Sequence, residues 1–136
     1  MVSLALVVAE FNHSVTAAME DAAREAAAEA GATLVEVVHV PGAYDAPLVA
    51  DRLARRDGIE AVAVLGAIVR GDTDHDRVIG NALADRLADV SVARDTPVTL
   101  GVMGPGMSGA EARERVSKGA EAVESALDLA ETLEEL

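Results

Sequence analysis

The chain has 136 residues and a formal net charge of −13, and this acidic balance disfavours a nucleic-acid-binding protein, which needs a basic surface. The absence of cysteine excludes disulfides and thiolate chemistry. Hydrophobic residues make up 51% of the chain, yet no apolar run approaches the roughly 20 residues that span a bilayer, so we expect one compact domain over residues 1–136, in the cytoplasm and without a membrane partner.

Strand-like and helix-like segments alternate along the chain. The apolar run at 3–10 predicts a first strand and not a signal peptide, because no basic region precedes it. The Ala/Glu-rich stretch 14–30 predicts a helix that ends at Gly31. The same alternation continues with strands at 33–40, 61–69 and 97–103 and with helices at 45–57 and 74–94. A last helix is predicted from Ser108, which fits a capping box with Glu111, to near the end of the chain.

This βαβαβαβα order predicts an α/β protein in which helices cover both faces of a four-stranded parallel sheet, as a three-layer α/β/α sandwich. Ligands bind such sheets at the carboxyl ends of the strands. Nearly all the unusual residues of the chain fall in the four loops expected there, at 10–13, 41–45, 70–76 and 104–108.

The third of these loops combines features of an anion site. Gly71 permits close approach of the backbone, Thr73 can cap the next helix, and a helix N-terminus attracts anions. His75 would then stand in the first helical turn, where it can exchange protons near neutral pH. The alternatives are a capped helix start with solvated charges, or a metal site drawn from Asp72, Asp74, His75 and Asp76, which we disfavour because adjacent helical residues point in different directions.

Phe11 and Tyr44 are the only aromatic residues, and both stand beside loop signals. Each can pack into the core or offer a flat face to a heteroaromatic ligand. Asp45 can cap its helix or accept hydrogen bonds from a polyol.

Arg113 and Arg115, expected near the start of the last helix, are either exposed charges or ligands that grip phosphate with a planar guanidinium. Lys118, the sole lysine, is by default a helix-surface residue. We interpret His13 as a polar loop residue and His39 as a strand residue, with no catalytic role.

Four segments carry a family resemblance: VVAEFN (7–12), VPGAYDAP (40–47), GAIVRGDTDHD (66–76) and PVTLGVMGPGM (97–107). In this order they resemble the lumazine synthases, in particular the short archaeal type, over essentially the whole chain. The resemblance implies a flavodoxin-like fold. It also implies condensation of 5-amino-6-ribitylaminouracil with 3,4-dihydroxy-2-butanone 4-phosphate to 6,7-dimethyl-8-ribityllumazine, phosphate and water, with no metal or organic cofactor.

The resemblance further assigns roles to individual residues, with His75 as the general acid/base. The residues implied for the pyrimidine and its ribityl chain are Phe11, Ala43, Tyr44, Asp45, Ala67, Ile68, Val69 and Leu100. Those implied for the phosphate are Asp72, Thr73 and Arg115.

Several positions depart from the common bacterial pattern. Leu100 stands in place of a Phe that helps wall the pocket, and Asp45 in place of a Glu. The spacing around Arg115 also differs, which leaves open whether Arg113 or Lys118 contributes to the site.

The family forms pentamers or shells of twelve pentamers, with active sites between subunits. A homo-oligomer is therefore expected, in which the first strand and the Phe11 loop face the third and fourth loops of a neighbour.

Three other functions compete with this interpretation: an archaeal-type riboflavin synthase, a lumazine or flavin carrier, and a non-catalytic shell protein. The predicted phosphate loop argues against the first two, because neither needs a phosphate site. The acidic composition separately predicts adaptation to high salt, where ions screen the repulsion between carboxylates.

Overall fold

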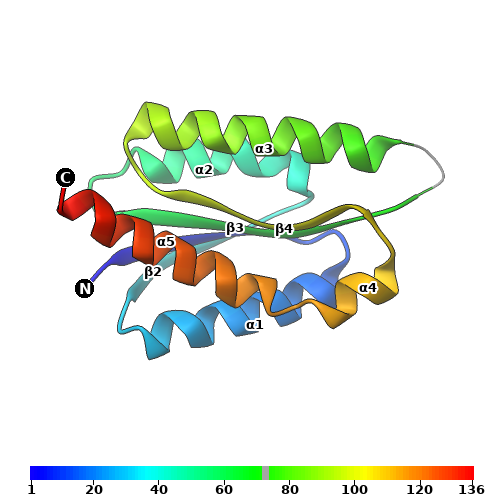
Figure 1. Ribbon diagram of the computed structural model, residues 1–136, viewed down its shortest axis with the longest axis horizontal. Coiled ribbons are helices and arrows are strands. Elements are labelled where there is room, and N and C mark those ends of the chain that lie inside the picture. The colour runs from blue at the N-terminus through cyan, green and yellow to red at the C-terminus, as the bar shows by residue number, and fades with distance from the viewer. Residues whose placement is uncertain (72–73) are drawn as a thin grey trace.

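The computed structural model describes residues 1–71 and 74–136 and contains a four-stranded, all-parallel sheet with the order β2-β1-β3-β4. Helices cover both faces (Figure 1), which confirms the predicted α/β/α sandwich with a flavodoxin-like arrangement. The strands are β1 (Ser3–Ala9), β2 (Thr33–Val40), β3 (Ala61–Val69) and β4 (Val98–Met107), and the helices are α1 (His13–Glu29), the 3₁₀ turn η1 (Ala43–Asp45), α2 (Ala46–Ala54), α3 (His75–Arg94), α4 (Gly109–Glu114) and α5 (Lys118–Glu134).

The core is aliphatic and lies in two layers because the central strands alternate their side chains between the two faces of the sheet. On β1, Leu4, Leu6 and Val8 pack against α1 and α5, whereas Ala5 and Val7 face α2 and α3. β1 and β3 are buried on both faces, and this explains why their sequences are apolar throughout. No helix in the part of the chain that the structure describes is long and apolar enough to cross a membrane.

The end of β4 differs from the prediction, which placed residues 104–108 in a loop. β4 continues to Met107, which pairs with Val69 after an irregularity in the ladder and accepts a hydrogen bond from the N–H of Arg70 at 2.7 Å. Gly104 and Gly106, with φ of 92° and 83°, allow the irregularity. The Gly-Pro-Gly signal therefore marks a kink within the strand and not its end.

The last helix is also divided, where the sequence predicted a single one. Ser108 caps α4 as expected, but α4 ends at Glu114 and a separate helix, α5, begins at Lys118. α4 contacts the ends of β3 and β4, whereas α5 lies along α1 and the sheet (Figure 1). The break lets the chain turn from the end of the sheet onto its face.

Candidate active site

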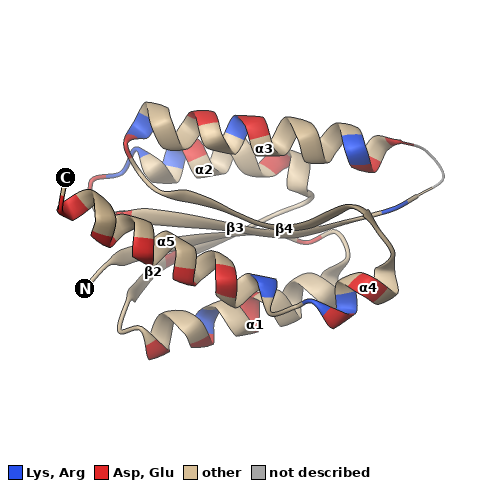
Figure 2. Cartoon of the chain, in the orientation of Figure 1, with Lys and Arg blue, Asp and Glu red and all other residues tan. Residues whose placement is uncertain are grey.

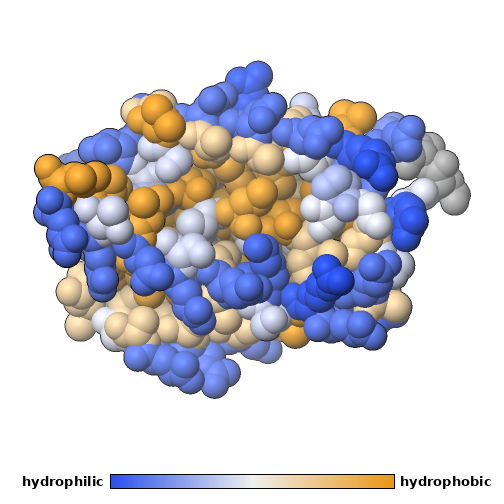
Figure 3. All heavy atoms as spheres, in the orientation of Figure 1, coloured by the Kyte–Doolittle hydropathy of each residue, from blue (hydrophilic) through white to orange (hydrophobic). Residues whose placement is uncertain are grey.

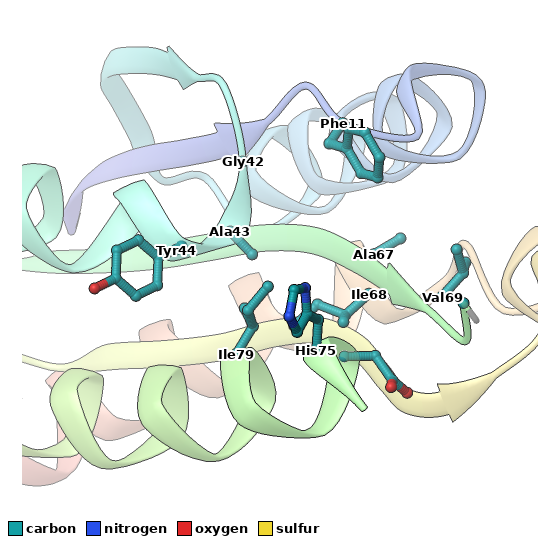
Figure 4. Close-up of a pocket in the computed structure, with 11 residues that line it drawn as sticks. Phe11, Gly42, Ala43, Tyr44, Ala67, Ile68, Val69, His75 and Ile79 are labelled. Carbon is teal, nitrogen blue, oxygen red and sulfur yellow. The ribbon is translucent and has the colours of Figure 1, made fainter. Parts of the chain in front are cut away.

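A pocket of about 350 Å³ opens at the carboxyl ends of the strands, where the sequence predicted ligand binding. Figure 4 shows the loop after β1 on one side and the first turns of α3 on the other, with the end of β3 between them. The lining residues are Phe11, Gly42, Ala43, Tyr44, Ala67, Ile68, Val69, Gly71, His75, Asp76 and Ile79. Seven of the predicted site residues are thus brought together: Phe11, Ala43, Tyr44, Ala67, Ile68, Val69 and His75.

Hydrogen bonds to the neighbouring chain segments hold Phe11 in the pocket. Its N–H donates to the carbonyl oxygen of Pro41 at 3.0 Å, continuing the β1–β2 pairing beyond the strand. Asn12 follows in the left-handed region, with φ 64°, and its side-chain amide donates to the carbonyl oxygen of Ala67 at 2.9 Å. Sequence reasoning did not single out Asn12, because this bond connects residues far apart in the chain.

The two aromatic residues lie outside the core. Phe11 is 70% exposed and Tyr44 73% exposed, although both line the pocket. For these residues the core-packing alternative is therefore wrong in this chain. Exposed rings beside a largely apolar pocket offer flat faces to a planar ligand.

Asp45 does not line the pocket. Its Oδ2 accepts a hydrogen bond from the N–H of Gly42 at 3.0 Å, and its side chain makes no cap bond to α2. Asp45 therefore occupies the N-cap position of α2, as one alternative predicted, but its side chain does not cap that helix. The carboxylate instead fixes the turn that carries Ala43 and Tyr44.

His75 lies in the first turn of α3, as predicted, and is its first residue; its ring faces the pocket beside Ile68 and Ile79 (Figure 4). Asp72 and Thr73, the predicted phosphate residues of this loop, lie outside the described residues. His75 and Phe11 line the same pocket in one chain. The Phe11 loop and the third loop therefore meet within one chain, and this contact needs no neighbouring subunit.

Asp76, Ile79, Gly42 and Gly71 also line the pocket but were not among the predicted site residues. Asp76 had been considered only as a metal ligand, and the described residues contain no group of three or more His, Asp or Glu side chains that could hold a metal ion. The Asp76 side chain is instead 7% exposed, and its Oδ2 accepts a hydrogen bond from the N–H of Gly106 at 2.9 Å. The sequence feature that could have singled out Asp76 is the position of an Asp in the first turn of the predicted helix.

Leu100 and Arg115 lie outside this pocket. Leu100 is in β4, paired with Val64, and is 41% exposed at the edge of the sheet. Arg115 directly follows α4. It lies close enough to Glu111 for its charge to help lower the pKa of that carboxyl, although hydrogen bonds with Ser108 are the largest cause and Arg70 also contributes. Two basic side chains, one just after β3 and one just after α4, therefore lie near the start of α4.

The remaining candidates occupy the surface. Arg113 is exposed on α4, Lys118 begins α5, and His13 begins α1. His39 extends from β2 to Glu20 on α1, with its Nε2 2.6 Å from Oε1. None of these four lines the pocket, and the non-catalytic interpretation of His13 and His39 stays a prediction.

A comparison with family models matches residues 1–134 to "6,7-dimethyl-8-ribityllumazine synthase". The chain belongs to the 6,7-dimethyl-8-ribityllumazine synthase family. This confirms the resemblance, and with it the prediction of a transferase; the riboflavin synthase, carrier and shell-protein alternatives are not favoured.

Relatives of the same name cover almost the whole chain. The 6,7-dimethyl-8-ribityllumazine synthase of Halobacterium salinarum is 72% identical over 133 residues, which are 98% of this chain and 100% of the relative. The synthase of Halorubrum lacusprofundi is 68% identical over 134 residues, again 98% and 100%. That of Methanocaldococcus jannaschii is 41% identical over 136 residues, covering 100% of this chain and 96% of the relative.

Proposed function

We propose that this pocket is where the chain forms 6,7-dimethyl-8-ribityllumazine, from 5-amino-6-ribitylaminouracil and 3,4-dihydroxy-2-butanone 4-phosphate, with release of phosphate and water. The observation that carries the proposal is that the only two aromatic side chains of the chain flank a pocket that also contains His75. This arrangement suits a planar heterocycle that must exchange protons while it is held in place.

The pyrimidine lies against Phe11 in this proposal. Its ring stacks on the exposed face of the Phe11 side chain, and backbone groups of Ala67, Ile68 and Val69 contact its edge. Ala43 and Tyr44 hold the ribityl chain, with Asp45 fixing their turn. Little else is required of the apolar lining than to exclude water and orient the ring.

His75 serves as the general acid/base. The 5-amino group attacks the ketone carbonyl and water leaves to give an imine. Phosphate is then eliminated, and the resulting enol tautomerises to a ketone. The ribitylamino nitrogen attacks this ketone and a second water leaves, which closes the second ring. Each step moves a proton to or from nitrogen, oxygen or carbon, and an imidazole can donate and accept such protons near neutral pH. Holding the two substrates together supplies further acceleration, and no metal or organic cofactor takes part.

The phosphate is assigned to Asp72, Thr73 and Arg115. The N-terminus of α3 supports this assignment because free N–H groups and the helix dipole favour an anion there. Arg115 carries a guanidinium that can bind phosphate in a bidentate manner.

We further propose that the chain works as a homo-oligomer, a pentamer or a shell of pentamers, with Leu100 and Arg115 completing the site of a neighbour. β4 is an edge strand, and such edges are usually covered. Figure 3 shows apolar residues gathered between α3 and α5, and this face includes the exposed side chains of Val92, Leu100, Leu129 and Leu133. Light scattering in high salt tests this: the mass of a single chain would contradict the shared site.

The activity is tested by mixing purified protein with both substrates in high salt while lumazine fluorescence and phosphate release are followed. Stoichiometric appearance of both products is expected. If neither appears while lumazine still binds, the pocket is a binding site and the assignment of His75 is wrong.

A further inference from the structure

Asp76 is the only charged residue that is buried among those the structure describes. Burial of a carboxylate is unfavourable unless it is hydrogen-bonded, and here Oδ2 accepts the N–H of Gly106 at 2.9 Å. The bond connects the first turn of α3 to the kinked end of β4, two segments 30 residues apart in the chain. It therefore joins the helix that carries His75 to the sheet.

The end of β4 is itself tightly held. A side chain at Gly104 would collide with the carbonyl oxygen of Ile68, so β4 presses on the end of β3 at this point. On the other side, a methyl group at Gly80 would lie only 2.7 Å from Cδ of Pro105, so α3 packs directly on the kink. The backbone at Gly106 is thus held in place, and it can fix the position of a side chain that accepts its N–H.

α3 has few other buried side chains near its start. Its 20 residues include three buried side chains, Asp76, Leu83 and Leu87, and the nearest of the apolar pair comes two turns after the helix begins. Asp76 is consequently the only buried side chain in the part of the helix that carries His75 into the pocket, beside the partly buried Ile79, which packs against the core.

We propose that Asp76 is a positioning residue, which holds the first turn of α3, and with it His75, over the pocket by accepting the N–H of Gly106. The inference rests on the proposed role of His75. A general acid/base must stay within hydrogen-bond reach of the reacting atoms, and a misplacement of about 1 Å can cost roughly a hundredfold in rate.

The test compares Asp76→Ala with Asp76→Asn, whose side-chain carbonyl can still accept the Gly106 N–H, and with Asp85→Ala, an exposed carboxylate later on α3. We expect kcat to fall roughly tenfold to a hundredfold in Asp76→Ala and to recover to near the wild-type value in Asp76→Asn, with Asp85→Ala unchanged. Fluorescence titration with the lumazine product counts competent sites, and this number should be the same in all four proteins. Equal kcat in Asp76→Ala and wild type would overturn the inference.

Two further results decide the cases that a comparison of these variants leaves open. If Asp76→Asn is as slow as Asp76→Ala, the charge of the carboxylate acts and not the bond to Gly106, and the positioning role is wrong. If Asp76→Ala does not fold, Gly80→Ala decides, because it favours the helix yet pushes α3 away from Pro105; full activity there contradicts the inference. An inactive wild-type protein would instead refute the proposed function before any variant is compared.

Discussion

Phe11 and Tyr44 stand at the rim of the pocket, although aromatic rings ordinarily supply core volume. The two layers of the core are filled by Val, Leu, Ile, Ala and Met instead. Phe11 is held in place by one backbone hydrogen bond to Pro41 and by the adjacent Asn12, not by burial of its own ring. We therefore expect these two aromatic residues to contribute to ligand binding more than to folding.

Replacement of His75 should slow the chemical step. We expect His75→Ala to lower kcat by roughly a hundredfold or more, the usual scale for loss of a general acid/base. His13→Ala is the matched control, because His13 is exposed at the start of α1 and does not line the pocket. Steady-state kinetics measure both, and full activity in His75→Ala would remove this residue from the mechanism.

Arg115 and Arg113 can be distinguished by the substrate that each affects. Arg115→Ala should raise the KM for the phosphorylated ketone far more than it raises the KM for the pyrimidine, because a guanidinium on phosphate contributes roughly tenfold or more to binding. Arg113→Ala, on the adjoining helix α4, should leave both constants unchanged. If the effects are exchanged, Arg113 is the phosphate residue; equal changes in both constants for Arg115→Ala would indicate a folding defect.

At the scale of elements, glycine sets how closely helices and strands approach. A methyl group at Gly101 would lie 2.6 Å from Cβ of Ala122, and one at Gly119 would collide with the carbonyl oxygen of Met19. β4 therefore packs closely on α5, and α5 on α1. The small side chains that are abundant in the core make this close packing possible without aromatic residues.

The capping box of α4 should make part of the stability depend on pH. Ser108 Oγ accepts the N–H of Glu111 at 3.1 Å, and Glu111 Oε1 accepts the N–H of Ser108 at 3.2 Å. The Ser108 hydrogen bonds, with Arg70 and Arg115 nearby, lower the pKa of Glu111 below its ordinary value of 4.5. Because the folded state favours the ionised carboxylate, its contribution is fully present above pH 4.5 and is lost as the pH falls through the lowered pKa.

Glu111→Ala tests this contribution. Its melting temperature should lie below that of the wild type at about pH 7, and the difference should shrink at about pH 3. Glu114→Ala, on the same helix but outside the capping box, is the control. A difference that is independent of pH would show that the charge of Glu111 does not contribute.

At the scale of the whole molecule, the main feature is the excess of acidic side chains on the surface. Figure 2 shows acidic residues along the outer sides of the helices, including much of α5. Of the 35 charged Asp, Glu, Lys and Arg side chains, 24 are acidic, and relatives at 72% and 68% identity come from Halobacterium salinarum and Halorubrum lacusprofundi. We therefore propose that the fold depends on salt to screen repulsion between carboxylates.

This salt dependence predicts a melting temperature that rises between dilute buffer and molar KCl. Neutralisation of four acidic residues on α5 should weaken the rise, because repulsion on that helix is then smaller; the substitutions are Glu124→Gln, Asp128→Asn, Glu131→Gln and Glu134→Gln. Calorimetry on both proteins measures the effect. A wild-type melting temperature that does not change with salt would refute the adaptation.

The sequence by itself determined the order of the elements, the parallel sheet and the edge at which the pocket opens. β2 and β3 have the predicted bounds, and Gly31, with φ 74°, follows α1 as expected. These features depend on local patterns: apolar runs buried on both faces, amphipathic helices and residues that stop them. Because the carboxyl ends of parallel strands lie at the same edge of the sheet, the loops that follow these strands are brought together there.

Only the tertiary structure decided how those loops are joined. The continuation of β4 through Gly104 and Gly106 depends on its pairing with β3, and the separation of α4 from α5 depends on packing against α1. Asn12 and Asp76 gain their importance from hydrogen bonds to Ala67 and Gly106, 55 and 30 residues away in the chain. The partner of a polar side chain across such a distance is chosen by the folded arrangement, and no local pattern in the sequence records it.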